Sequence, residues 1–285
     1  MDKARKGDGE ESVNSNNQGS QSDCNSQSQL LPLVEAEIIP RLMQAHSHRE
    51  NQNGIEPKSL PAAEVVAFTQ AILKEDSSVA NDQITKLRSH GLAPEAMYLY
   101  LLSPAARYLG ELWESDECSF SQVTLGIWRI QQIMYELSPA FHASHKPQLS
   151  TDKQPRILIA TLPGSQHPFG LSMLSEFFRS EGWAVLAIPA PSNPELLDAL
   201  VSNWFDIFAL SISLDRDLDN AKNVIEFARK RSCNPGINVI VGGPLLLNNP
   251  DAADALGADG SSIDAPSALN LASQLLKQQH EVSFN

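Results

Sequence analysis

The 285-residue sequence is poor in cysteine and contains no long hydrophobic run. Its three cysteines, Cys24, Cys118 and Cys233, are far apart and form no Cys-x-x-Cys pair. Neither a disulfide framework nor a zinc site is therefore expected. No apolar stretch approaches the roughly 18 residues of a membrane span, and the N-terminus has no apolar signal core. These absences predict a protein of the reducing cytoplasm.

Basic residues are also scarce. The sequence has 21 lysines and arginines against 34 aspartates and glutamates, which gives a formal net charge of −13. Proteins that bind nucleic acid by themselves usually present a clustered basic face. The one short basic group, 229–231, is expected near a helix C-terminus, where the helix dipole favours cations. Direct sequence-specific binding to DNA is therefore not expected.

The N-terminal segment has two parts. Residues 1–29 are mostly polar, so they cannot bury enough apolar surface to offset the entropy of ordering, and a disordered tail is expected. Residues 30–58 combine an amphipathic helix with a polar linker. The helix has one apolar stripe and a proline, Pro40, that predicts a kink. Such a helix either packs on the rest of the chain or docks on another protein.

Residues 59–148 follow a helical pattern throughout. Apolar side chains recur at spacings of three and four from 97 to 112 and again from 123 to 137, and Gly91 and Pro94 precede the first set. With two further apolar stripes upstream, the pattern predicts a four-helix bundle. These stripes are first of all core, whatever the bundle binds.

From 155 to 280 strand and helix signals alternate. The sequence predicts strands at 156–161, 184–188, 206–212, 237–241 and 258–263, and helices near 168–181, 194–203, 217–231, 250–255 and 265–279. Apolar strands separated by helices predict a parallel sheet that is covered on both faces. The expected fold is an α/β, flavodoxin-like (Rossmann-type) domain with five parallel strands, preceded by an all-α bundle.

A histidine lies on the first predicted strand-to-helix loop, Gly164-Ser165-Gln166-His167-Pro168-Phe169-Gly170. Open α/β sheets bind ligands at this carboxyl end of their strands. Small residues follow two more predicted strands, in Ser211-Ile212-Ser213-Leu214 and in Gly242-Gly243-Pro244. Taken singly, these features are an ordinary surface histidine, strand-end polarity and a tight turn.

Together the segments resemble cobalamin-binding domains. The histidine loop resembles their Asp-x-His-x-x-Gly loop, whose imidazole becomes the lower ligand of cobalt, and this implies the same role for His167. Ser165 stands in the place of the aspartate, and its hydroxyl can still accept the ring N–H. The resemblance makes the loop a cofactor site with Gln166, Phe169 and Gly170. It also implies that the small residues line the slot for the displaced nucleotide tail: Ser211, Ser213, Leu214, Gly242, Gly243 and Pro244.

A second motif lies in the helical region. Leu109-Gly110-Glu111-Leu112-Trp113 resembles the helical cap that precedes cobalamin domains in light-responsive and methyl-transferring proteins. In the photoreceptor branch the tryptophan covers the upper corrin face, and a Glu-His pair follows after nine residues. Here Val123-Thr124 occupies that position, so Trp113, Val123 and Thr124 are expected at the upper face, without the histidine. A core tryptophan is the alternative.

Any upper-face histidine must then come from elsewhere. His142 and His145 lie just past the expected end of the last bundle helix, at the start of the linker to the first strand. They are either surface histidines of that linker, or they fold over the pocket mouth as upper cobalt ligands.

The motifs, together with residues 35–46 and Glu176-Phe177-Phe178-Arg179, resemble the PpaA/AerR family, the cobalamin-binding antirepressors of photosynthesis genes in purple bacteria. The resemblance covers residues 33 to 275. It implies adenosylcobalamin or hydroxocobalamin as cofactor and a DNA-binding repressor of the PpsR/CrtJ type as partner. It also implies a light- or cobalamin-responsive role without enzymatic activity. Two alternatives stay open, a corrinoid methyl carrier of the same fold and a haem sensor whose histidine holds iron.

Overall fold

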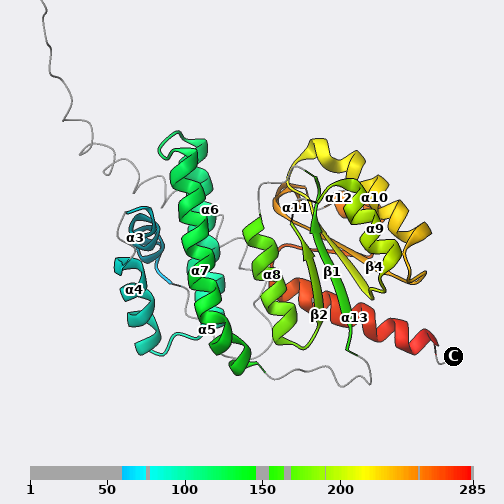
Figure 1. Cartoon of the computed structure of the whole chain (residues 1–285), viewed down its shortest axis with the longest axis horizontal. Coiled ribbons are helices and arrows are strands. Elements are labelled where there is room, and N and C mark those ends of the chain that lie inside the picture. The colour runs from blue at the N-terminus through cyan, green and yellow to red at the C-terminus, as the bar shows by residue number, and fades with distance from the viewer. Residues whose placement is uncertain are drawn as a thin grey trace, which may run out of the picture. The chain divides into compact units, whose positions relative to one another are not determined.

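A computed structural model describes residues 60–74, 78–145, 154–163, 168–189, 191–249 and 251–283. All of them belong to one compact unit, Ser47–Asn285. The tail and the amphipathic segment predicted within residues 1–58 lie outside the described residues. Figure 1 shows a helical part followed by a sheet covered by further helices.

The helical part, residues 60–144, contains α3 (Ala62–Leu73), α4 (Ser78–Ser89), α5 (Pro94–Met97), η3 (Tyr98–Leu102), α6 (Ser103–Glu114) and α7 (Phe120–Ser144). The π-helical turn η3 joins α5 to α6 without a break, so residues 94–114 form one long rod. A capping box of Ser119 and Gln122 begins α7. Large, fully buried side chains fill the core, among them Phe68, Tyr98 and Met134.

The sheet has five parallel strands in the order β2-β1-β3-β4-β5. The strands are β1 (Arg156–Thr161), β2 (Ala184–Ile188), β3 (Ile207–Ser211), β4 (Asn238–Gly242) and β5 (Gly260–Ser262). This is the flavodoxin-like strand order, so the predicted fold class is confirmed. Strands β1, β3 and β4 are the inner strands and, like the edge strand β2, they consist mainly of apolar residues, because helices cover both faces of the sheet.

Helices cover the sheet on its two faces. They are α8 (Pro168–Ser180), α9 (Asn193–Ser202), α10 (Leu218–Arg231), α11 (Pro244–Asn248), α12 (Ala252–Leu256) and α13 (Ala265–Ser283), with a short 3-10 turn η4 (Asp215–Asp217) before α10. Buried residues of α8 and α13 share one core with the sheet, and those of α9, α10 and α12 share the other. The sequence did not predict α11. Its Gly-Gly-Pro start is typical of a turn, but a proline in the first helical turn lacks only an N–H that needs no partner there.

Helix α8 belongs to two hydrophobic cores. Phe169, Met173 and Phe177, spaced by four residues, are buried in the core of the helical part. Leu171 and Phe178 on the same helix are buried against the sheet. Figure 1 accordingly shows α8 between α7 and the strands. No helix of the described residues is both long enough and apolar enough to cross a membrane.

Candidate functional site

The carboxyl ends of four strands meet at one level. Thr161 of β1 is paired with Ser211 of β3, Ser211 with Gly242 of β4, and Gly242 with Ser262 of β5. The row therefore consists of small side chains only. In a sheet of this order, the ligand crevice lies outside the carboxyl ends of β1 and β3, where the strand order reverses. Sequence reasoning identified two members of this row, Ser211 and Gly242.

The two adjacent glycines are required by their protein neighbours. A Cβ at Gly242 would lie 3.0 Å from the carbonyl oxygen of Ser262. Gly243 has a φ of +105°, and its Cβ would lie 2.5 Å from the carbonyl oxygen of Ile212. Backbone hydrogen bonds join the loops after β3 and β4 at this point, from Ile212 N to Gly242 O at 2.8 Å and from Leu245 N to Ile212 O at 3.2 Å. The two glycines therefore allow the backbones of these loops to approach within hydrogen-bonding distance. That the glycines also contact a nucleotide tail stays a prediction.

The same edge has one unsatisfied polar group. The hydroxyl oxygen of Ser213, on the loop after β3, is buried and has no hydrogen-bond partner among the described residues. A buried hydroxyl without a partner destabilises a protein by about 1–3 kcal/mol, so such groups usually serve a ligand, an ion or a water. Ser213 was among the residues predicted to bind the cofactor.

Large apolar side chains are exposed on the segments that follow three of these strands. Leu214 follows β3, Leu247 lies in α11 after β4, and Ile263 follows β5, and they are 45%, 41% and 41% exposed. Sequence reasoning found Leu214 but missed the other two, because their nearness depends on the strand register. Exposed apolar groups beside an unsatisfied hydroxyl suit a large ligand with both apolar and amide surfaces, as a corrin has.

The helical part contributes an exposed aromatic pair. Trp113, in the last turn of α6, is 44% exposed, and Phe120, at the start of α7, is 64% exposed. Their ring centroids are 6.4 Å apart in an edge-on arrangement. A core tryptophan would be buried, so the exposure favours the cap interpretation of Trp113. Sequence reasoning missed Phe120, although it lies within the nine residues that follow the tryptophan.

Two more cap residues take different positions. Val123 is half-buried and packs on the core of the helical part. Thr124 is exposed, and its hydroxyl donates a hydrogen bond to the carbonyl oxygen of Phe120 at 2.8 Å, so this donor is already used within the helix. Neither side chain replaces the chemistry of the Glu-His pair.

The histidine loop itself is only partly described. Ser165, Gln166 and His167 lie outside the described residues, between the end of β1 and Pro168, where α8 begins. Phe169 is 8% exposed and belongs to the core of the helical part. Gly170 is exposed, and nothing lies within 4 Å of the position of its missing Cβ. Pro244, predicted to adjoin the slot, is an exposed residue in the first turn of α11.

His142 and His145 are not brought to the cap. The Nε2 atom of His142 lies 3.1 Å from the Oε2 atom of Glu176 on α8. The ring of His145 lies against Phe141, with its Nδ1 atom 2.8 Å from the carbonyl oxygen of that residue. These contacts are at the C-terminal end of α7, about 33 Å along the helix axis from Phe120 at 1.5 Å per residue. Both imidazoles are therefore held by contacts at that end of α7, and a role for either as an upper cobalt ligand stays a prediction.

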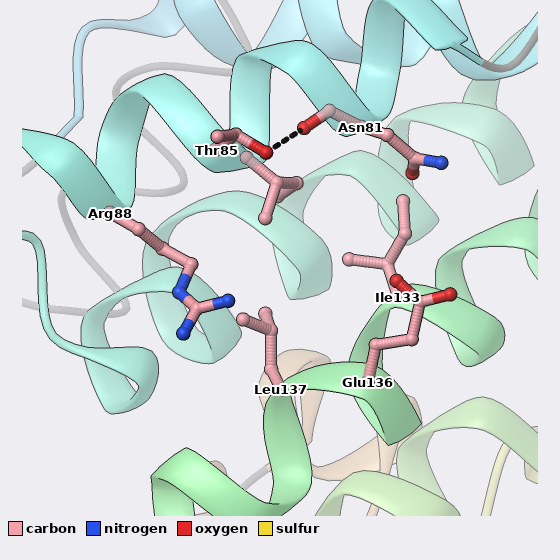
Figure 2. Close-up of a pocket in the computed structure, with 7 residues that line it drawn as sticks. Asn81, Thr85, Arg88, Ile133, Glu136 and Leu137 are labelled. Atoms are coloured by element: carbon pink, nitrogen blue, oxygen red, sulfur yellow. Dashed lines mark hydrogen bonds between the residues drawn. The ribbon is translucent and has the colours of Figure 1, made fainter.

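A separate small pocket lies between α4 and α7. It has a volume of about 120 Å³ and is lined by Asn81, Ile84, Thr85, Arg88, Ile133, Glu136 and Leu137. Figure 2 shows Arg88 and Asn81 on α4, with Glu136 across from them on α7. Cofactor sites usually measure about 300–1,000 Å³, so this pocket is too small for a corrin.

No group of three or more histidine, cysteine, aspartate or glutamate side chains in the described part of the chain could hold a metal ion. A corrin ring would itself supply most of the ligands of its cobalt ion, so a cobalamin site requires no such group.

Comparison with known proteins defines the class. Residues 155–272 match the family model of a B12 binding domain, and residues 66–138 match a second model with the same description. The first match spans the sheet from β1 into α13, and the second spans the helices from α3 into α7. The chain therefore contains a helical B12 binding domain that precedes a Rossmann-like one.

Two relatives narrow this class. An uncharacterised 20.5 kDa protein from the bchF–crtJ intergenic region of Rhodobacter capsulatus is 27% identical over 176 residues, which are 61% of this chain and 88% of the relative. A corrinoid protein of Desulfitobacterium hafniense is 23% identical over 172 residues, 59% of this chain and 76% of the relative. The two domain matches and the relative encoded beside crtJ confirm the predicted family.

A solved structure supports the fold. The monomethylamine corrinoid protein of Methanosarcina barkeri superposes with a TM-score of 0.59 at 14% identity, over 75% of this chain and 100% of that one. This likeness extends across both the helical and the sheet part.

Proposed function

We propose that this cobalamin-binding protein is a sensor without catalytic activity, which controls a DNA-binding repressor of the PpsR/CrtJ type by direct contact. The family resemblance and the Rhodobacter relative encoded beside crtJ support the regulatory role. The acidic chain favours action through a bound protein rather than on DNA itself. The observation that best supports a cofactor site at the carboxyl edge is the Ser213 hydroxyl, which is buried without a hydrogen-bond partner among the described residues and lies beside exposed apolar side chains.

The residues have distinct roles in this proposal. His167 would hold the cobalt of cobalamin through its imidazole, and Ser165 would orient the ring. Ser213 supplies a hydrogen bond to the displaced tail beside Gly242. Trp113 and Phe120 would pack against the cofactor and exclude water from it. When bound, the cofactor would supply a cobalt centre that exchanges a ligand or, in the adenosyl form, responds to light.

Titration with hydroxocobalamin tests the cofactor site. We expect His167→Ala to lose tight binding and the spectral shift that a cobalt-bound imidazole causes. His90→Ala, at an exposed position on α4's C-terminal side, is the matched control and should bind like the wild type. Wild-type affinity in the His167 variant would remove that residue from the site.

A gel-shift assay tests the regulatory role. The protein alone should give no sequence-specific shift at physiological salt, whereas it should change repressor–operator binding only when cobalamin is present. A specific complex of this chain with DNA in the absence of repressor would overturn the proposal. An equal effect without cobalamin would confine the cofactor to a structural role.

A methyl-carrier role is the second candidate, because the Desulfitobacterium relative and the Methanosarcina structure are corrinoid proteins. A carrier must give up the methyl group of bound methylcobalamin to an acceptor in the dark. The visible spectrum of the loaded protein, followed in cell extract with and without a thiol acceptor, distinguishes a carrier from a sensor.

Spectra after reconstitution with haem or with cobalamin test the haem alternative in the same way.

A further inference from the structure

Helix α7 presents large apolar side chains to solvent. Leu125, Trp128 and Tyr135 are 45%, 54% and 51% exposed. Their spacings of three and seven residues place them on one side of the helix. We call Leu125, Trp128, Gln132 and Tyr135 the α7 face. Exposed tryptophan and tyrosine side chains that gather on one surface are typical of protein–protein interfaces.

The α7 face is distinct from the side of α7 that builds the core. The opposite side is buried in the helical part through Ile130, Ile133, Met134, Leu137 and Phe141. The nearby Arg129 turns away, because its guanidinium donates to the carbonyls of Ile72 and Lys74 at the end of α3. The α7 face therefore carries no charged side chain between Leu125 and Tyr135.

Acidic side chains flank the face at both ends. Glu114 is exposed at the end of α6, Asp116 and Glu117 are exposed on the turn between α6 and α7, and Glu136 is exposed beside Tyr135. An uncharged aromatic centre with acidic ends is complementary to an amphipathic helix whose apolar side is bordered by lysine and arginine. A second copy of this chain is a poor fit, since its own acidic ends would meet acidic ends.

The face is continuous with the cap. Helix α7 begins at Phe120, which contacts Trp113, and Leu125 follows Thr124 directly. Helix α7 thus carries Phe120 and Thr124 of the expected cap near its start, and the α7 face begins at the next residue, Leu125.

We propose that the α7 face docks a basic amphipathic helix from the DNA-binding domain of the repressor. The inference rests on the proposed function and adds the surface and the chemistry of the partner to it. A basic helix held against this acidic-ended face is withdrawn from DNA phosphates, which lowers operator affinity. The cap at the start of α7 places this contact next to the cofactor.

Binding to purified PpsR/CrtJ-type repressor tests the proposal, with full-length protein loaded with hydroxocobalamin. We expect Trp128→Gln to raise the dissociation constant at least tenfold and Glu136→Gln to slow association at low salt. Val79→Gln and Val201→Gln are matched controls, since these side chains are 47% and 48% exposed on α4 and α9, and they should stay within twofold of the wild type. The visible spectrum of bound cobalamin should be the same in all variants.

Each other outcome identifies what has failed. If the wild type does not bind the repressor, the proposed function fails and the docking proposal with it. If the wild type binds and Trp128→Gln binds equally well, only the α7 face is wrong. A change of oligomeric mass in the Trp128 variant would assign the face to a second copy instead. A loss of thermal stability with unchanged repressor affinity would assign it to another segment of this same chain.

Discussion

Gly243 shows how strictly single positions at the carboxyl edge are fixed. Its positive φ and the 2.5 Å approach to the Ile212 carbonyl leave no room for a side chain. Gly170 is the opposite case, because the space around its Cβ position is open. The first glycine is required by the protein, whereas the second leaves room that a ligand is expected to use.

These two glycines give a paired prediction. Gly243→Ala should lower the free energy of unfolding by about 2 kcal/mol, because it strains the backbone and separates two hydrogen-bonded loops. Gly170→Ala, near the start of α8, should leave stability unchanged or raise it by up to about 1 kcal/mol, while weakening cobalamin binding. Urea denaturation and cobalamin titration of both variants check this. Equal destabilisation by the two substitutions would contradict the difference in their surroundings.

Trp113 is predicted to distinguish between upper ligands. Because its indole is half exposed, Trp113→Ala should cost little stability, but it should weaken adenosylcobalamin about tenfold more than hydroxocobalamin, as the adenosyl group loses its aromatic contact. Trp204→Ala is the control. Trp204 is similarly exposed, at 45%, but it lies just before β3, at the end of that strand opposite the carboxyl edge. Titrations with the two cobalamins in the dark measure the ratio. An unchanged ratio in the Trp113 variant would leave the indole without a role in the cap.

At the scale of the elements, α7 and α8 are joined by a buried carboxylate. Glu176 on α8 is 4% exposed and accepts a hydrogen bond from the Ser138 hydroxyl on α7. His142 of α7 lies beside it, and Arg179 donates to its other oxygen at 3.3 Å. Burial, reinforced by the Glu176 charge, raises the pKa of the neighbouring Tyr98 hydroxyl, which donates to the Met134 carbonyl at 2.6 Å.

Substitution of Glu176 tests this connection. Glu176→Leu should lower the free energy of unfolding by about 1–3 kcal/mol, because the Ser138 hydroxyl loses its acceptor in a buried place. Glu176→Gln keeps an acceptor oxygen and should lose clearly less. Chemical denaturation at neutral pH measures both. If the two variants lose the same amount, the negative charge and not the hydrogen bond joins the helices.

The sequence predicts the strands and helices more completely than it predicts the candidate cofactor site. The strands agree with the predicted ranges to within two residues. For β1, β3 and β4 the reason is that buried parallel strands are continuous apolar runs. The π-turn η3 and the short α11 leave no such pattern. His167 and Gly242 follow from motifs, whereas Phe120, Ser262, Leu247 and Ile263 do not. Strand register brings Ser262 beside Gly242 and places Leu247 and Ile263 on the segments after neighbouring strands, and helix packing brings Phe120 against Trp113.

At the scale of the whole molecule, the described residues form two folded parts that share α8. One side of this helix completes the core of the helical part, and the other completes a core of the sheet. We therefore expect a single unfolding transition, with a calorimetric enthalpy equal to the van't Hoff enthalpy. Two resolved transitions, one helical and one of the sheet, would show that the parts unfold independently.

Sharing α8 has a consequence for hydrogen exchange. At a free cobalamin concentration one hundred times the dissociation constant, the native state gains about 2.7 kcal/mol. If the parts open only together, every slow amide that exchanges through global opening is protected by the same factor, about one hundredfold. Amides in the middle of α3, in the helical part, and in β4, in the sheet, should then report the cofactor equally, whichever of them is closer to it.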